Sequence, residues 1–197
     1  KFAGALKSQG AKKGDRIIIY MPMIPEDVIA MLACARIGAI HSVVFGGFAS
    51  NELASRIDDS KAKILVTASC GFEPGRTVEY KPLVDEAINQ ANHKIDKMIL
   101  FQRSGHEVKL NAASEVSWDE VTSNSEEIDC VEMSSNEFAY ILYTSGTTGT
   151  PKGIVRDIGG HIVALKWTMK NIYNIDEGDI WWSASDIGWI VGHSYIV

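Results

Sequence analysis

The segment 143–153, with the sequence YTSGTTGTPKG, combines glycines, hydroxyl side chains and one lysine. Residues this small bury little apolar surface, but they allow backbone N–H groups to approach an anion closely. The hydroxyl groups and the ammonium of Lys152 can complete the coordination of such an anion. The apolar run 139–142, directly before the segment, predicts a buried strand that leads into it. The pattern therefore predicts a phosphate-binding loop, and a polyphosphate is the ligand that it fits.

The spacing of this loop differs from that of a Walker A motif, which needs four residues between its glycines and a lysine directly after the second. Here two residues separate Gly146 from Gly149, and a Thr-Pro dipeptide precedes Lys152. The alternative interpretation is a flexible linker rich in Ser, Thr and Gly. A linker requires neither the Pro-Lys-Gly ending nor the buried strand before it, so we favour the phosphate loop.

The composition fits a soluble globular protein, because 46% of the 197 residues are hydrophobic and 22% are charged. The formal net charge of −6 argues against nucleic acid as a main partner, since a phosphate backbone requires a basic surface. No apolar run reaches about 18 residues, so we expect no membrane-spanning helix. Three widely spaced cysteines without a CxxC pair favour a reducing compartment. The five histidines lack metal-ligand spacing, so we expect no metal site built from them.

Strand patterns alternate with helix patterns along the chain. We expect strands over the ranges 16–21, 40–45, 64–67, 98–101, 139–142 and 180–183. We expect helices over the ranges 1–9, 25–37, 50–59, 83–91 and 160–172. Pro25 suits a first turn, Gly38 a helix end and Ser50 a cap. We expect loops over 68–77 and over 103–135, the second with one short helix inside it. This order predicts an α/β fold, a mostly parallel sheet flanked by helices, with ligands at the carboxyl ends of the strands.

Four segments, taken together and in this order, resemble one family. They are VVFGGF at 43–48, GFEPGR at 71–76, the phosphate loop at 143–153 and SDIGWIVGHSY at 185–195. The phosphate loop alone resembles that of the adenylate-forming superfamily, which includes acyl-CoA synthetases, nonribosomal peptide adenylation domains and luciferases. The ordered set covers nearly the whole chain and resembles the large N-terminal domain of a short-chain acyl-CoA synthetase of the acetyl or propionyl type. The EPGR and GIVRD segments are more similar to the propionyl branch, which favours propionate over acetate as the substrate.

The resemblance implies a reaction in two halves. A carboxylate attacks the α-phosphate of ATP to give acyl-AMP and pyrophosphate, and the thiol of CoA then attacks the acyl carbon and releases AMP. ATP is expected with Mg²⁺, and CoA is expected as co-substrate. Donors preorganised around the leaving pyrophosphate would lower the barrier of the first half. The residues expected to surround the phosphates are Thr144, Ser145, Gly146, Thr147, Thr148, Gly149, Lys152 and Gly153, with Lys152 as the catalytic residue. The alternative for Lys152 is a solvated surface lysine.

The resemblance also implies a CoA site made of two segments. The first is a strand-to-helix loop expected near the nucleotide of CoA, with the residues Phe45, Gly46 and Gly47. A tight turn explains its glycines equally well. The second segment consists of Glu73, Pro74, Gly75 and Arg76. Relatives that prefer acetate usually carry arginine at the first of these positions, so we expect Arg76 to bear more of the phosphate contact here. The alternative for Arg76 is an ordinary surface arginine.

The acyl pocket is the third site that the resemblance implies, at a turn that follows the expected strand 180–183. Its expected walls are Trp189, Ile190 and Val191, with Val191 also near the arm of CoA. The alternative for Ile190 and Val191 is that they are core residues. The attacking carboxylate is already ionised and needs no base, so we expect His193 to pack and to form hydrogen bonds rather than to act as a general base.

Two other interpretations are an adenylation domain that loads a carrier protein and a non-catalytic nucleotide- or CoA-binding module. The segments 71–76 and 185–195 argue against the first, and the retained Lys152 argues against the second. We expect small-molecule partners, with neither nucleic acid nor a membrane, and the sequence leaves the oligomeric state open. The cytoplasm and the mitochondrial matrix both suit such an enzyme. We expect residues 1–197 to be part of an N-terminal AMP-binding domain, truncated at both ends and without its C-terminal domain.

Overall fold

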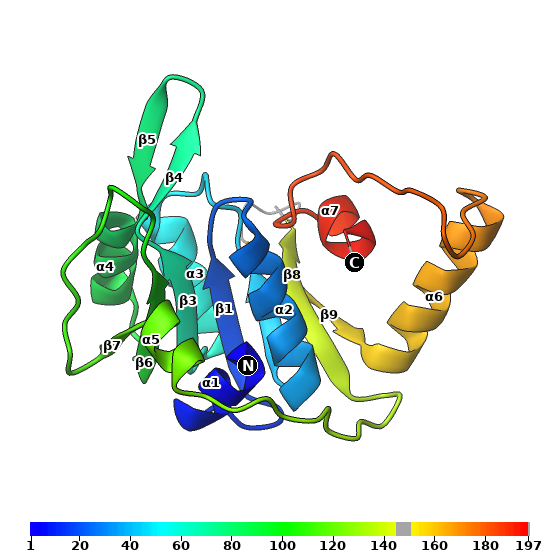
Figure 1. The fold of residues 1–197 in the computed structure, drawn as a ribbon, viewed down its shortest axis with the longest axis horizontal. Helices are drawn as coiled ribbons and strands as arrows, with labels where there is room; N and C mark the ends of the chain where they lie inside the picture. Colours follow the sequence, from blue (N-terminus) through cyan, green and yellow to red (C-terminus); the bar gives the residue numbers. More distant parts are fainter. Residues whose placement is uncertain (145–150, 197) are drawn as a thin grey trace.

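The computed structural model describes residues 1–144 and 151–196. Their main sheet has seven strands, β1 Arg16–Tyr20, β2 Ile40–Val43, β3 Ile64–Ala68, β6 Lys97–Phe101, β7 Glu115–Ser117, β8 Phe138–Thr144 and β9 Lys152–Asp157. The strands lie in the order β7-β6-β3-β1-β2-β8-β9 (Figure 1). Neighbouring strands are parallel except β8 and β9, which are antiparallel. The expected α/β fold with a mostly parallel sheet is confirmed.

Helices cover both faces of this sheet. The helices are α1 Phe2–Ser8, α2 Pro25–Ile37, α3 Ser50–Ser60, α4 Tyr80–Gln90, α5 Trp118–Ser123, α6 Ile158–Asn171 and α7 Ile190–Tyr195. Buried residues of α1, α2 and α5 form one hydrophobic cluster, and buried residues of α3 and α4 form another. In Figure 1, α6 stands away from the sheet on the right, and α7 lies between α6 and β8.

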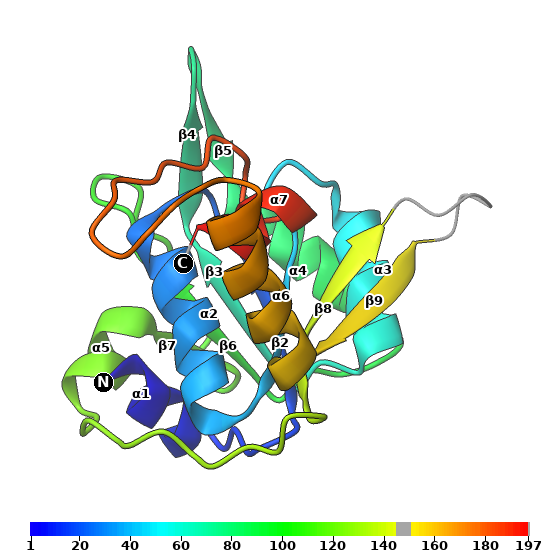
Figure 2. The same ribbon diagram turned by 90° about the vertical axis from the view of Figure 1, so that its right-hand side faces the viewer.

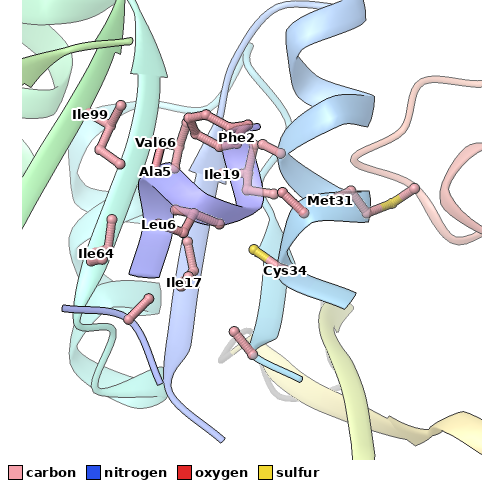
Figure 3. Packing of buried hydrophobic residues seen from close by; sticks show 14 of the residues in the cluster. Phe2, Ala5, Leu6, Ile17, Ile19, Met31, Cys34, Ile64, Val66 and Ile99 are labelled. Atoms are coloured by element: carbon pink, nitrogen blue, oxygen red, sulfur yellow. The ribbon is translucent and has the colours of Figure 1, made fainter. Parts of the chain in front are cut away.

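β1 is buried on both faces, as its sequence RIIIY predicts. Side chains alternate along a strand, so Ile17 and Ile19 pack under α1 and α2, whereas Ile18 and Tyr20 pack under α3 and α4. Figure 3 shows the first of these two clusters, including Leu6, Met31 and Cys34. The burial of β1 between two helical layers fixes the centre of the sheet.

The ends of α2 are those that the sequence predicts. Pro25 is the first helical residue, where its missing N–H and fixed φ carry no penalty. Glu26 lies in the first turn, where its negative charge interacts favourably with the positive end of the helix dipole, and the buried Asp27 follows it. Gly38 ends the helix in the left-handed conformation with φ 69°, which L-residues with a side chain rarely adopt.

Two local predictions are wrong. Residues 180–183 form no strand, and the side chains of Ile180 and Trp182 are 98% and 82% exposed. The run is apolar enough for a strand, but a strand also needs a pairing partner, and the described residues place none beside it. Ser50 is the first residue of α3 rather than its cap, and the N-cap residue, Ala49, has no side chain that could serve as one.

The expected loop 68–77 is instead largely a hairpin. β4 Cys70–Glu73 pairs in antiparallel fashion with β5 Arg76–Glu79. Gly75, in the turn between them, has φ 79°. In Figure 1 this hairpin projects beyond the sheet from the end of β3. The strands β7 and β9 are also additions to the expected set of elements.

Candidate functional site

The segments expected to bind ligands leave the sheet at one edge. β1, β2, β3 and β8 are mutually parallel, so their carboxyl ends point the same way. The loop 44–49 follows β2 and the β4–β5 hairpin follows β3 (Figure 2), and the expected phosphate loop begins at the end of β8. Segment 186–189 returns to the same edge immediately before α7. Strand direction alone thus gathers segments that lie far apart in the sequence.

The structure places the two ends of the phosphate loop side by side. Thr144, the last residue of β8, pairs with Lys152, the first residue of β9. Because this pairing is antiparallel, the chain returns to the point where the loop began, and Gly153 pairs with Tyr143. The expected lysine therefore lies next to the first expected hydroxyl. The other expected phosphate contacts lie outside the described residues, namely Ser145, Gly146, Thr147, Thr148 and Gly149.

Tyr143 is anchored to α3 by groups that the sequence analysis did not single out. Its hydroxyl donates a hydrogen bond of 2.7 Å to Oδ2 of Asp59. The guanidinium carbon of Arg56 lies 5.3 Å from the centre of the Tyr143 ring and 4.7 Å from that of Phe48. Arg56 is buried and forms an ion pair of 2.8 Å with Glu52. Two cation–π contacts of one arginine thus link the strand of the phosphate loop to the loop that contains Phe48.

Gly46 lies where its neighbours leave no room for a side chain. A Cβ at this position would overlap the hydroxyl of Tyr80 and would lie 2.9 Å from the carbonyl oxygen of Met21. Gly188 is confined in the same way, because its Cβ would lie 2.7 Å from the Cα of Phe45. Close approach of other parts of the protein is therefore sufficient to explain glycine at both positions.

A cavity of about 190 Å³ opens beside this loop. Its lining comes from the loop after β2, from the hairpin and from their neighbours, and includes Phe45, Gly46, Gly47, Glu73, Tyr80 and Asp186. The structure thus brings the expected CoA residues of the loop together with the first CoA residue of the hairpin. Pro74 and Gly75 form the turn beyond it, and Arg76 begins β5.

Arg76 is paired with Glu73 across the hairpin. Its Nη2 lies 2.6 Å from Oε2 of Glu73, and its Nε donates a hydrogen bond of 2.7 Å to the same oxygen. The side chain of Arg76 is 70% exposed, so this ion pair contributes little net stability. An anion that reaches the hairpin therefore competes with one weakly held carboxylate for the guanidinium.

The structure separates the three residues expected to wall the acyl pocket. The centre of the Trp189 ring lies 5.5 Å from that of Phe45, which lines the cavity with the expected CoA residues. Ile190 and Val191 begin α7 and line a different cavity, of about 660 Å³, together with Tyr140 and other residues. Within the described residues, Ile190 and Val191 are 47% and 52% exposed and do not belong to either hydrophobic cluster. They also do not follow a strand, because 180–183 is irregular.

His193 is buried and forms a hydrogen bond, as expected, and its partner is His41 of β2. The two Nε2 atoms lie 2.8 Å apart, so one ring donates and the other accepts. Burial lowers the pKa of His193 to about 4, and His161 adds to the effect. Burial also lowers the pKa of His41 well below its usual range, with His193 and His161 contributing. Both imidazoles are therefore neutral near pH 7.

The described residues contain neither a cluster of metal ligands nor a helix that could span a membrane. Within residues 1–144 and 151–196, no group of three or more His, Cys, Asp or Glu side chains could hold a metal ion. In the same part of the chain, no helix has the length and apolar character needed to cross a membrane.

Comparison with protein families matches residues 1–197 to the family described as AMP-binding enzyme. The chain belongs to this family. Among curated relatives, the acyl-CoA synthetase short-chain family member 3, mitochondrial, of Homo sapiens is 56% identical over 197 residues, which are 100% of this chain and 29% of that protein. The acetyl-coenzyme A synthetase of Photobacterium profundum is 47% identical over 199 residues, 100% of this chain and 31% of that protein. The resemblance to short-chain acyl-CoA synthetases is confirmed.

A solved structure of acetoacetyl-CoA synthetase from Streptomyces lividans matches the fold with a TM-score of 0.86. The match covers 98% of this chain and 30% of that chain, at 24% sequence identity, and it bears on the fold alone. This AMP-binding chain thus spans less than a third of the length of the relatives that it matches.

We predict that Gly46→Ala destabilises the protein by about 1–3 kcal/mol, because the added methyl group overpacks against Tyr80 and Met21. Urea unfolding of the full-length protein measures the change. Tyr80→Phe provides the matched background, since it removes the hydroxyl that the methyl group would overlap. Gly46→Ala should lower the free energy of unfolding by less in the Tyr80→Phe background than in the wild type. An equal cost in both backgrounds would show that Gly46 does not accommodate the Tyr80 hydroxyl.

The histidine pair predicts a loss of stability in acid. Both pKa values are lower in the folded state than the ordinary value of about 6.5, so the unfolded chain binds more protons below that pH. The free energy of unfolding should therefore fall as the pH drops from about 6.5 towards 4, by up to about 1.4 kcal/mol per pH unit for each histidine. Urea unfolding across this range tests the slope. A His41→Gln/His193→Gln variant should show a shallower slope than the wild type, and an unchanged slope would contradict the assignment.

Proposed function

We propose that the full-length protein is an AMP-forming acyl-CoA synthetase that converts a short-chain carboxylate, ATP and CoA to acyl-CoA, AMP and pyrophosphate. The observation that carries this proposal is the convergence of the four family segments at the carboxyl edge of one sheet, with Lys152 paired beside Thr144. The printed names of the relatives, short-chain acyl-CoA synthetase and acetyl-coenzyme A synthetase, support it. We further propose that residues 1–197 form part of the N-terminal AMP-binding domain of that enzyme.

In this proposal the phosphate loop acts on the first half-reaction. The carboxylate attacks the α-phosphate of ATP, which enters as its Mg²⁺ complex, and the bond to pyrophosphate breaks. The backbone of Lys152 is held at the start of β9 by its pairing with Thr144, which places this lysine directly after the expected phosphate loop. A positive charge there would stabilise the leaving pyrophosphate more than the bound substrate, and this difference would lower the barrier.

For the second half-reaction, we assign CoA and the acyl chain to two different cavities. We place the nucleotide of CoA in the cavity lined by Phe45, Gly46, Gly47 and Glu73, with Arg76 held beside it by its ion pair with Glu73. We place the acyl chain against Ile190 and Val191, which line the 660 Å³ cavity beside α7. Val191 is the residue that would also meet the arm of CoA. Trp189 packs on Phe45 of the first cavity and directly precedes Ile190 of the second in the chain.

The favoured carboxylate is propionate, with acetate as the alternative. The EPGR and GIVRD segments support propionate, and the 47% identity to a bacterial acetyl-coenzyme A synthetase supports acetate. The rat, mouse and human relatives carry the word mitochondrial in their names, which supports the mitochondrial matrix as the compartment, with the cytoplasm as the alternative.

We predict that Lys152→Ala in the full-length enzyme slows acyl-AMP formation by about 10²-fold, because one preorganised donor to the leaving pyrophosphate is lost. Carboxylate-dependent exchange between pyrophosphate and ATP measures this step separately from transfer to CoA. Lys109→Ala is the matched control, since Lys109 is an exposed lysine in the stretch between β6 and β7. If Lys152→Ala showed the wild-type rate of pyrophosphate–ATP exchange, Lys152 would have no role in acyl-AMP formation.

The Glu73–Arg76 pair predicts opposite effects for its two members. Arg76→Ala should raise the KM for CoA about 10-fold or more, since a charge-assisted contact to phosphate is lost. Glu73→Gln should lower that KM, because it frees the guanidinium from a competing carboxylate. Neither change should alter the pyrophosphate exchange. Steady-state kinetics at varied CoA concentrations measure the KM for CoA. If that KM were unchanged in both variants, Arg76 would be an ordinary surface arginine without a role in CoA binding.

A further inference from the structure

His41 and His193 join two elements that are 152 residues apart in the sequence. His41 lies in β2, beside the centre of the sheet, and His193 lies in α7. Both side chains are buried, with exposed fractions of 4% and 5%, and their Nε2 atoms are 2.8 Å apart. A hydrogen bond between two Nε2 atoms requires that the accepting Nε2 carry no proton and that the donating Nε2 carry one. The arrangement is therefore specific in geometry and in protonation state.

The pair is the centre of a cluster with one residue from each of four elements. The ring of Tyr140, from β8, lies 4.1 Å from that of His193. The hydroxyl of Tyr140 lies 3.3 Å from Nδ1 of His161, in α6. The charged groups on the side of β9 are Arg156, which lowers the pKa of His161, and Asp157, which raises it. The cluster thus connects the sheet to both helices that border the cavity with Ile190 and Val191.

α7 depends on such contacts for its position. It has six residues, and an isolated helix of this length is unstable in water. Its first two residues, Ile190 and Val191, are about half exposed and provide little anchoring. Its buried residues are Gly192, His193 and Ser194. Among these, His193 has the largest side chain, and it carries the hydrogen bond that ties the helix to β2.

We propose that His41 and His193 are a positioning pair for the acyl pocket. Their shared hydrogen bond fixes α7 on β2 and thereby fixes the wall formed by Ile190 and Val191. This inference rests on the proposed function for the identity of the pocket, but the placement of α7 does not depend on it. Neither histidine needs to touch the substrate or to transfer a proton.

Kinetics of the full-length enzyme test the proposal. His193→Leu removes the hydrogen bond and should raise the KM for the carboxylate in pyrophosphate–ATP exchange about 10-fold, while the KM for ATP stays within twofold. His193→Gln retains a donor and an acceptor near the original Nε2 and should restore most of the wild-type KM. The control is His93→Leu, because His93 also forms a hydrogen bond, 2.9 Å to the carbonyl oxygen of Ala62, but lies in the connection between α4 and β6. An unchanged carboxylate KM, or equal changes in both KM values, would overturn the pair's role.

Hydrogen exchange provides a second readout that needs no activity. Amides of residues 190–195 should exchange faster in His193→Leu than in the wild type or in His93→Leu, and equal rates would overturn the placement of α7 by the pair. If His193→Leu fails to fold, the His41→Leu/His193→Leu variant takes its place, because replacing both partners by apolar groups leaves no buried polar group unpaired. A wild-type carboxylate KM in that variant would show that packing alone positions the helix. If the wild-type enzyme showed no carboxylate-dependent pyrophosphate–ATP exchange, the proposed function would be refuted. The rates of amide hydrogen exchange in α7 would still decide whether the histidine pair positions this helix.

Discussion

Ile17, Ile18 and Ile19 are fully buried because helices cover both faces of β1. A strand that is buried on both faces must satisfy its backbone groups through neighbouring strands, and here β2 and β3 pair with it in parallel. The carboxyl ends of parallel strands lie at the same edge of the sheet, so the loops that follow β1, β2 and β3 all begin at that edge. The site at that edge is a consequence of how the core is buried, and the loops supply its chemistry.

Close backbone contacts then hold the loops against one another. Gly46 accommodates Tyr80, and Gly188 accommodates the backbone of Phe45. Arg56 adds a polar link, because its guanidinium lies over both Phe48 and Tyr143. The loop after β2 is therefore in contact with α4 and with the segment before α7, and Arg56 of α3 links it to Tyr143 of β8.

The sequence predicted the features that depend on local pattern. The apolar strands, the Pro25 start and the Gly38 end of α2 are confirmed because propensity and burial agree there. The prediction of a strand over 180–183 is wrong, because an apolar run does not reveal whether a partner strand is available. β9 was missed because it is exposed along its length and lacks the buried pattern. His41–His193 joins residues too distant for any local pattern. Glu52 and Arg56 have the i,i+4 spacing of an ordinary helix pair, and nothing in that spacing reveals that the guanidinium lies over two aromatic rings.

The distribution of charge at the edge suits a polyanion. Asp27 is 1% exposed, and burial together with Asp186 raises its pKa well above the usual range, which favours its neutral form. Burial likewise raises the pKa of Tyr80, so its phenol stays protonated beside Gly46. Groups inside the edge are thus kept neutral, whereas the cations Lys152 and Arg76 are exposed. A phosphate arriving from solvent meets these cations first. Glu73 opposes such an anion, so competition between Glu73 and phosphate for Arg76 sets how tightly the hairpin holds the proposed CoA nucleotide.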